Sequence, residues 1–160
     1  MRALFIHSGN MFGGIETALI SVASACQRGG ASIAPEFALC FDDGRVATDL
    51  RATGVGVHSL GAARMSRPWQ IQQSRARLRR LLESSAPDLC VTPSAWSHAL
   101  FAPVVRKRRL PLVLWAHDRL TPGRWLDRLA LRHRPDLVVA NSRYTAEGMT
   151  AVLPDVPVRV

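Results

Sequence analysis

Residues 7–19, HSGNMFGGIETAL, form a glycine-rich turn whose residue types could bind a negatively charged group. The turn follows a short apolar run and leads into a helical pattern. Gly13 and Gly14 stand at the start of that helix, and their missing side chains would let a diphosphate approach the main chain. The first N–H groups of a helix lack partners inside it, and the peptide dipoles add about half a positive charge there. The turn therefore predicts diphosphate binding by backbone groups.

Two better-known phosphate motifs do not fit this turn. A P-loop requires Lys followed by Ser or Thr, and this chain has Ile15 and Glu16 there. The dinucleotide fingerprint G-x-G-x-x-G differs from the spacing Gly9-x-x-x-Gly13-Gly14 found here. Glu16 brings negative charge to the turn, unless it points aside and stabilises the helix terminus. The alternative to anion binding is that the glycines merely allow a tight turn.

Further polar side chains end or follow other apolar runs. In parallel α/β sheets, ligands bind beyond the carboxyl ends of the strands, so we expect these side chains to line a cleft. An imidazole at position 117 could orient a hydroxyl group or ease the charge at a reacting carbon, and the neighbouring carboxylate could accept a hydrogen bond. Capping of the next turn is the alternative for Asp118. Ser94 and Ser142 are natural N-caps of the helices that follow them, and Asn141 is a standard turn residue. The residues are His7, Ser94, His117, Asp118, Asn141, Ser142 and Arg143.

Strand and helix patterns alternate about six times along the chain. Apolar runs predict strands at 2–7, 37–41 (starting near Ile33), 55–60, 89–92, 112–116 and 137–140, with a turn into another strand at 154–160. The run at 112–116 is fully apolar, which predicts burial on both faces. Helical spacing and stop signals predict helices at 15–28 (ended by Gly29-Gly30), 46–52, 69–84, 95–108, 124–132 and 143–152. The alternation predicts an α/β fold: a Rossmann-like, doubly wound parallel sheet of about six to seven strands with helices on both faces.

The bulk composition predicts one globular domain over residues 1–160. No run approaches the roughly 20 apolar residues that cross a bilayer, and the apolar start is too short for a signal peptide. We therefore expect a cytoplasmic protein. The net charge is +9, and arginines cluster at 75–80 and 106–109. Such clusters attract the phosphates of nucleic acid or anionic lipid, unless they are solvated helix faces.

Several residues predict packing rather than chemistry. Cys26, Cys40 and Cys90 are isolated and lie in apolar surroundings, without the C-x-x-C spacing of zinc or redox sites. They are expected to be buried free thiols. His98 lies in a helical segment and is expected to pack.

Three segments together resemble the N-terminal half of a family-4 glycosyltransferase of the GT-B fold. They are GGIE after the first strand, WAHD after the fifth and VVANSRYTAEGM at the sixth, and the resemblance runs over the whole chain. It implies two Rossmann-like domains facing across a cleft, with the acceptor bound mostly by the N-terminal one. It also implies a nucleotide-sugar donor as substrate, retention of anomeric configuration, and no cofactor or metal.

The resemblance also implies roles for single residues. Gly13 and Gly14 match the loop that approaches the donor diphosphate, and His117 matches a histidine that contacts the donor sugar. With Asp118 beside it, His117 is the expected catalytic group. Asn141 and Ser142 match the cleft floor, and His7, Glu16, Ser94 and Arg143 are expected to line the cleft.

The same resemblance predicts partners. The C-terminal, donor-binding domain of the enzyme is absent from these residues, so we expect the isolated domain to be inactive. The acceptor would be a glycan or lipid-linked molecule, and the basic segment SRPWQIQQSRARLRRLL could lie against an anionic membrane at the inner face. The alternatives are a stand-alone nucleotide- or nucleic-acid-binding basic α/β module and a GT-B epimerase. No nucleic-acid partner is expected, because aromatics are few and no binding motif is present.

Overall fold

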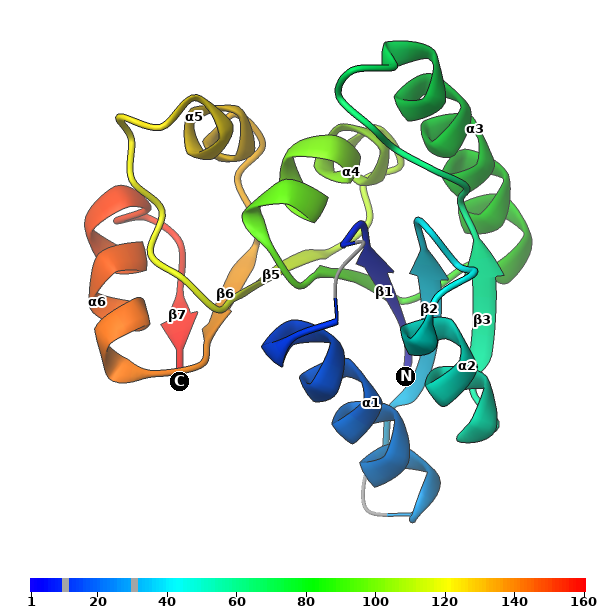
Figure 1. Ribbon diagram of the computed structural model, residues 1–160. Helices are drawn as coiled ribbons and strands as arrows, with labels where there is room; N and C mark the ends of the chain where they lie inside the picture. The colour runs from blue at the N-terminus through cyan, green and yellow to red at the C-terminus, as the bar shows by residue number, and fades with distance from the viewer. Residues whose placement is uncertain (10–11, 30–31) are drawn as a thin grey trace. The chain divides into compact units, whose positions relative to one another are not determined.

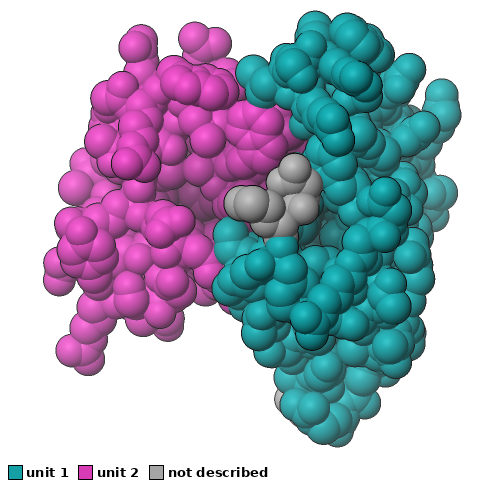
Figure 2. Space-filling model, viewed as in Figure 1, with its two compact units in different colours: residues 1–88 teal, residues 89–160 magenta. Residues whose placement is uncertain are grey.

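A computed structural model describes residues 1–9, 12–29 and 32–160 of the chain (Figure 1). These residues divide into two compact units, residues 1–88 and 89–160 (Figure 2). Each unit consists of parallel strands joined by helices. The described residues form seven strands and six helices.

Unit 1 contains three strands in the order β3-β2-β1, each parallel to its neighbour. The register pairs Phe5 of β1 with Phe37 of β2, and Phe37 with Val57 of β3. The phenyl rings of Phe5 and Phe37 stack with centroids 5.2 Å apart. The elements are β1 (Arg2–His7), α1 (Gly14–Gln27), β2 (Ala34–Leu39), α2 (Arg45–Ala52), β3 (Gly56–Ser59) and α3 (Pro68–Ser85).

Burial in unit 1 follows the apolar spacing of its strands and helices. The middle of β1 is fully buried, and each helix contributes apolar side chains at helical spacing, such as Leu78 and Leu82 on α3. This burial is the main driving force for docking the helices. The strand ends are thereby held in place, with His7 as the last residue of β1.

Unit 2 contains four parallel strands in the order β4-β5-β6-β7. Leu114 of β5 and Val138 of β6 pair in register and share a buried cluster with Met149 of α6. The elements are β4 (Leu89–Thr92), α4 (Ala95–Lys107), β5 (Leu112–Ala116), α5 (Trp125–Leu131), β6 (Leu137–Ala140), α6 (Arg143–Val152) and β7 (Val158–Arg159).

The predicted fold class is confirmed, and the boundaries differ at a few places. Strand β2 spans Ala34–Leu39 rather than 37–41, because Phe41 has a φ of 58° and so leaves the extended conformation. The expectation that the strand at 112–116 is buried on both faces is wrong, since Val113 and Trp115 are only half-buried. Helix α1 ends at Gln27, and Gly30 of its predicted stop signal lies outside the described residues.

The cysteines are free thiols, as predicted, and two of them are buried. Burial raises the pKa of the Cys40 and Cys90 thiols to about 12, so both are protonated at neutral pH. The prediction of burial is wrong for Cys26, which is partly exposed. None of the helices in the described parts of the chain is both long and apolar enough to cross a membrane.

Candidate functional site

The glycine pair stands at the start of α1, in unit 1. Gly13 is the N-cap residue in an extended conformation, Gly14 is the first helical residue, and both are exposed. A Cβ atom at Gly14 would meet nothing within 4 Å. The helix start is therefore open on the side where Gly14 lacks a side chain. Asn10 and Met11, in the same turn, lie outside the described residues.

Glu16 is turned aside and stabilises the helix terminus, one of the two positions expected for it. Its Oε2 atom accepts a hydrogen bond from the Gly13 N–H at 2.9 Å. Its Oε1 atom lies 2.8 Å from Nε2 of His7 in an ion pair, and both side chains are buried. The carboxylate thus connects the end of β1 to the N-cap of α1. Its charge is directed at His7 and Gly13 rather than left without a partner beside the glycine turn.

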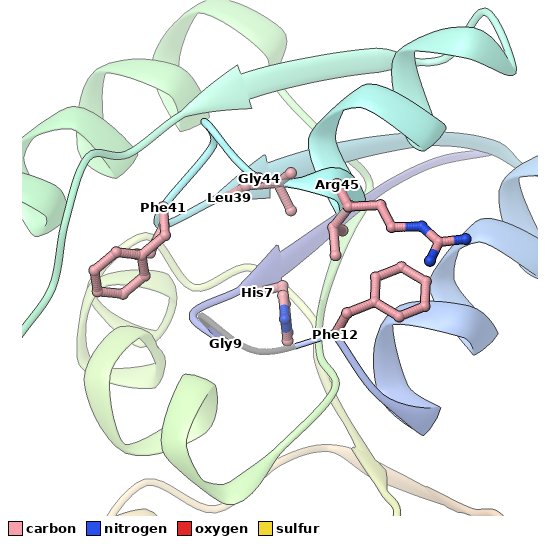
Figure 3. A pocket seen from close by; sticks show the side chains of 9 residues that line it. His7, Gly9, Phe12, Leu39, Phe41, Gly44 and Arg45 are labelled. Atoms are coloured by element: carbon pink, nitrogen blue, oxygen red, sulfur yellow. The ribbon is translucent and has the colours of Figure 1, made fainter.

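The absence of a side chain at Gly9 leaves room for the paired side chains of His7 and Glu16. A Cβ atom at Gly9 would lie 2.5 Å from Nε2 of His7 and 2.7 Å from Oε1 of Glu16, closer than real Cβ contacts. Gly9 is therefore required by the buried pair. The sequence pattern pointed to Gly9 only as the first glycine of the spacing Gly9-x-x-x-Gly13-Gly14. His7 also lines a small cavity with residues of α2 (Figure 3).

In unit 2, the structure brings His117 and Asn141 together. His117 follows β5 and is half-buried, with its ring tilted against Trp115 at a centroid distance of 4.8 Å. The Asn141 side-chain amide donates to the His117 carbonyl at 3.1 Å, and the Asn141 N–H donates to the Ala116 carbonyl at 3.1 Å. Asn141 therefore holds the main chain that carries the imidazole. Asp118 is exposed next to it.

Ser94 and Ser142 are helix N-caps. The Ser94 hydroxyl accepts from the Ser97 N–H at 3.1 Å, and the Ser142 hydroxyl accepts from the Thr145 N–H at 3.2 Å. The capping alternative is thus confirmed for Ser142, and Ser94 acts in the same way. Arg143 is exposed and lines a shallow surface groove along α6 and β7.

A contact that the sequence reasoning missed holds the loop after β5 against α6. The Arg119 side chain lies over Gly148, where a Cβ atom would collide with it, and its guanidinium lies 4.1 Å from the centroid of the Tyr144 ring. The signal was available, because glycine inside a helix is costly unless something approaches the backbone closely.

His98 packs, as expected, and its two hydrogen-bond partners are uncharged. Its Nδ1 lies 2.8 Å from the Thr92 hydroxyl and its Nε2 lies 2.7 Å from the His133 carbonyl oxygen. Because a carbonyl only accepts, Nε2 carries the proton and Nδ1 accepts from the hydroxyl. Burial lowers the pKa of His98 to about 4, so the ring is uncharged at neutral pH.

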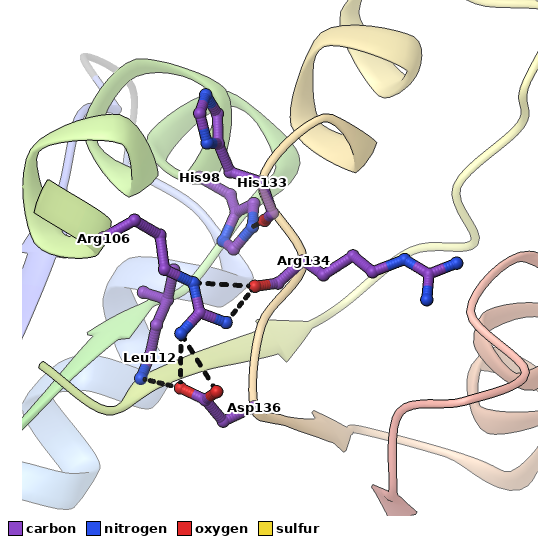
Figure 4. A network of polar contacts seen from close by, with 6 residues as sticks. All are labelled: His98, Arg106, Leu112, His133, Arg134 and Asp136. Carbon is purple, nitrogen blue, oxygen red and sulfur yellow. Dashed lines mark hydrogen bonds and ion pairs between the residues drawn. The ribbon is translucent and has the colours of Figure 1, made fainter. Parts of the chain in front are cut away.

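A polar network beside His98 uses part of the second basic cluster for structure (Figure 4). The Arg106 guanidinium binds both carboxylate oxygens of Asp136 at 2.9 Å and also donates to the Arg134 carbonyl. The same carboxylate accepts from the Leu112 N–H at 2.8 Å. Arg106 is thus engaged with unit 2 itself. No group of three or more His, Cys, Asp or Glu in the described ranges is arranged to hold a metal ion.

Comparisons with known proteins agree with this fold. Anabaena HepE in complex with UDP-glucose matches with a TM-score of 0.76 at 22% identity, over 99% of this chain and 43% of HepE. The lipopolysaccharide outer core galactosyltransferase WaaB, in its apo form, matches with a TM-score of 0.77 at 15% identity, over 100% of this chain and 45% of WaaB. A UDP-GlcNAc 2-epimerase from Neisseria meningitidis bound to UDP-GlcNAc matches with a TM-score of 0.70 at 12% identity, over 100% and 46%.

These identities show the fold alone, and this chain spans less than half the length of each structure. A search of the curated proteins gives no match. The profile of Glycosyltransferase Family 4 matches residues 12–160, which is nearly the whole chain and includes the glycine pair, His117 and Asn141. The resemblance predicted from the sequence is therefore confirmed, and the chain belongs to Glycosyltransferase Family 4.

Proposed function

We propose that this chain is the acceptor-side half of a glycosyltransferase that moves a sugar, of the hexosyl type, from a nucleotide-sugar donor to a glycan or lipid-linked acceptor with retention. Family membership supports the transferase reaction. Similar folds in complex with UDP-glucose and in a galactosyltransferase support a nucleotide-sugar donor. The observation that carries the proposal is the open, glycine-capped start of α1, where a Cβ atom added at Gly14 would meet no atom of the described residues within 4 Å.

In this proposal the donor diphosphate lies against the main chain at Gly13 and Gly14. The first N–H groups of α1, from Gly14 on, are the donors, because the Gly13 N–H already donates to Glu16. Cleavage of the sugar–phosphate bond leaves a nucleoside diphosphate with growing negative charge, which backbone N–H groups and the helix dipole stabilise without a metal or other cofactor. Pairing of the Glu16 carboxylate with His7 and with the Gly13 N–H favours this role, because the carboxylate is turned toward these partners and away from the phosphate. The proposal requires basic groups from a second domain for the remaining charge.

His117 and Asp118 are the proposed catalytic residues. The imidazole would hydrogen-bond a hydroxyl of the donor sugar and orient it, and the exposed Asp118 carboxylate would accept a hydrogen bond from the acceptor. Asn141 would support them, because its amide holds the His117 carbonyl. Ser142 and Ser94 would contribute through the helices that they cap, and Arg143 and His7 through the cleft lining.

We also propose that the protein is cytoplasmic and associates with an anionic membrane through α3. Arg79 and Arg80 are exposed on this helix, and Trp69 is exposed at its start. Each basic residue near an anionic surface contributes about 1 kcal/mol, so such a cluster gives reversible binding. Vesicles of phosphatidylglycerol and phosphatidylcholine test this: binding that falls with added salt supports it, and equal binding to neutral vesicles contradicts it.

A titration with UDP-glucose tests the donor role directly. We expect weak binding by the 160-residue chain, with amide shifts in NMR spectra centred on Gly13 and Gly14. We expect no sugar transfer by the chain alone, and transfer with retained anomeric configuration once a donor-binding domain completes the enzyme. Shifts absent from the α1 start would contradict the donor role. Interconversion of UDP-GlcNAc and its 2-epimer by the completed enzyme would favour the epimerase alternative.

A further inference from the structure

A second feature of unit 1 is a small cavity between the end of β1 and the start of α2 (Figure 3). We name it the α2 cavity; its lining includes His7, Gly9, Phe12, Leu39, Gly44 and Arg45. Its volume is about 60 Å³. A water molecule occupies roughly 30 Å³ in the liquid, so the cavity admits a few heavy atoms and not a whole sugar ring.

The cavity combines an apolar wall with a small number of polar groups, the usual composition of a small-molecule site. Phe12 and Leu39 supply the apolar wall, and His7 lies at its buried end. At the mouth, the Arg45 guanidinium lies over the Phe12 ring, 4.4 Å from its centroid. Figure 3 shows His7, Phe12 and Arg45 converging, whereas the ring of Phe41 points away from them.

The main chain adds hydrogen-bond donors at the same place. Gly44 is the N-cap of α2 and makes no side-chain cap bond, and the first turn of α2 carries no acidic residue. The first N–H groups of α2 have no partner inside the helix. The α2 cavity thus presents N–H donors, a guanidinium and an imidazole around an apolar wall.

The charges around the cavity are balanced. Arg45 forms an ion pair with Asp49 at 3.2 Å, and Asp42 accepts from the Ser59 hydroxyl at 2.7 Å with Arg51 3.6 Å away. The carboxylate of Glu16 is paired with His7. Asp43, which precedes the lining residue Gly44 in the loop, is exposed to solvent. This balance favours an uncharged ligand group over a phosphate or a carboxylate, because an ion would meet compensated charges and a nearby carboxylate.

We propose that the α2 cavity is a subsite for the uncharged, hydroxyl-bearing edge of an acceptor sugar ring. This inference rests on the proposed function, since a glycan acceptor supplies such an edge. The C–H face of the sugar packs on Phe12, one hydroxyl or hydroxymethyl group enters the cavity toward His7, and the Arg45 guanidinium and the α2 N–H groups donate to sugar oxygens. The cavity would then select acceptors by the hydroxyl pattern of one ring edge.

The test is an NMR titration of the isotope-labelled 160-residue chain with four methyl glycosides: glucoside, galactoside, mannoside and glucuronide. We expect one of the neutral glycosides to shift the amides of Gly44, Arg45 and Gly9 at millimolar concentration. Loss of a hydrogen bond from a charged group typically weakens binding by about tenfold, so Arg45→Ala should reduce the affinity by roughly that factor. Phe12→Leu, which keeps apolar volume and removes the aromatic face, should reduce it less.

Two control variants separate the cavity from its surroundings. Arg51→Gln removes the next arginine of α2 and leaves the cavity lining intact, so we expect unchanged affinity for the neutral glycosides. Asp49→Asn removes the carboxylate that compensates Arg45, so we expect the glucuronide to bind more tightly to this variant than to the parent chain. The proposal is overturned if no neutral glycoside shifts these amides of the parent chain at about 50 mM, well above the expected millimolar dissociation constant, or if the glucuronide binds the parent chain more tightly than every neutral probe. The response of Gly13 and Gly14 to UDP-glucose is measured on the same samples, so a failed cavity and a failed donor site are distinguishable.

Discussion

Two buried histidines, one in each unit, are held by partners of opposite kinds. His7 in unit 1 is 3% exposed and forms an ion pair with the Glu16 carboxylate at 2.8 Å. His98 in unit 2 is 1% exposed and contacts a hydroxyl and a carbonyl, which are both uncharged. With neutral partners, desolvation dominates and lowers the pKa of His98 to about 4. We infer that His98 stabilises the packing of unit 2, whereas the pair of His7 and Glu16 positions the glycine turn.

The largest expected effect comes from removing the carboxylate of the charged pair. Glu16→Ala leaves His7 buried without that carboxylate and frees the Gly13 N–H, so we expect a loss of about 3–5 kcal/mol in the free energy of unfolding. Urea denaturation followed by circular dichroism measures it. Glu16→Gln, which keeps an oxygen for the Gly13 N–H, should lose less. Unchanged urea midpoints for both variants would mean that the pair contributes nothing to the fold.

The neutral histidine should make stability depend on pH. The pKa of His98 is about 4 in the fold and about 6.5 when unfolded, so protonation opposes folding. The contribution of the neutral ring is fully present above pH 6.5 and is lost as the pH falls from 6.5 to about 4. The loss amounts to roughly 3 kcal/mol.

Urea midpoints measured between pH 4 and pH 7.5 on the parent chain and on His98→Gln isolate this contribution, since other titrating groups are common to both. The glutamine variant should be less stable at neutral pH and should show a shallower decline toward acid. Parallel pH profiles for the two proteins would contradict the assignment of a neutral buried ring.

The two glycines that flank the turn should respond in opposite ways to the same change. Gly9→Ala forces a Cβ atom against His7 and Glu16, and such overpacking costs about 1–3 kcal/mol. Gly14→Ala meets no atom and adds a better helix former, so stability should stay the same or rise by up to roughly 1 kcal/mol. Yet Gly14→Ala should weaken the response to UDP-glucose, because the methyl group covers the open helix start. If both changes lowered the free energy of unfolding equally, the contrast between a packed Gly9 and an open Gly14 would be wrong.

The contrast between local and distant contacts also explains what the sequence could predict. Apolar runs and helical spacing located the six helices and seven strands of the described residues along the chain, because these signals lie within one element. The order in which the strands pair within each unit was not predicted. The Ser94 and Ser142 caps were readable for the same reason. The contact between Asn141 and His117 depends on strand register, which no local pattern encodes. Glycine at position 148, inside a helical pattern, indicated a close approach, but the identity of the approaching side chain, Arg119, depends on the path of the loop. The pairing of His7 with Glu16 depends on the path of the glycine turn.

Substitution of the serine caps should have the smallest effect on stability. It also provides a control for the glycine cap of α1. Ser142→Ala removes the acceptor for the Thr145 N–H, and Ser94→Ala removes that for the Ser97 N–H, each at a cost of about 1 kcal/mol in unfolding free energy. The two serine side chains bond N–H groups of α4 and α6, whereas the proposed donor site is at the start of α1. Both variants should therefore keep the UDP-glucose response of Gly13 and Gly14. Urea denaturation and the NMR titration measure the two quantities on the same proteins. If Ser142→Ala instead abolished the nucleotide-sugar response at unchanged stability, the hydroxyl would have to contact the donor, and α6 rather than α1 would carry the binding amides.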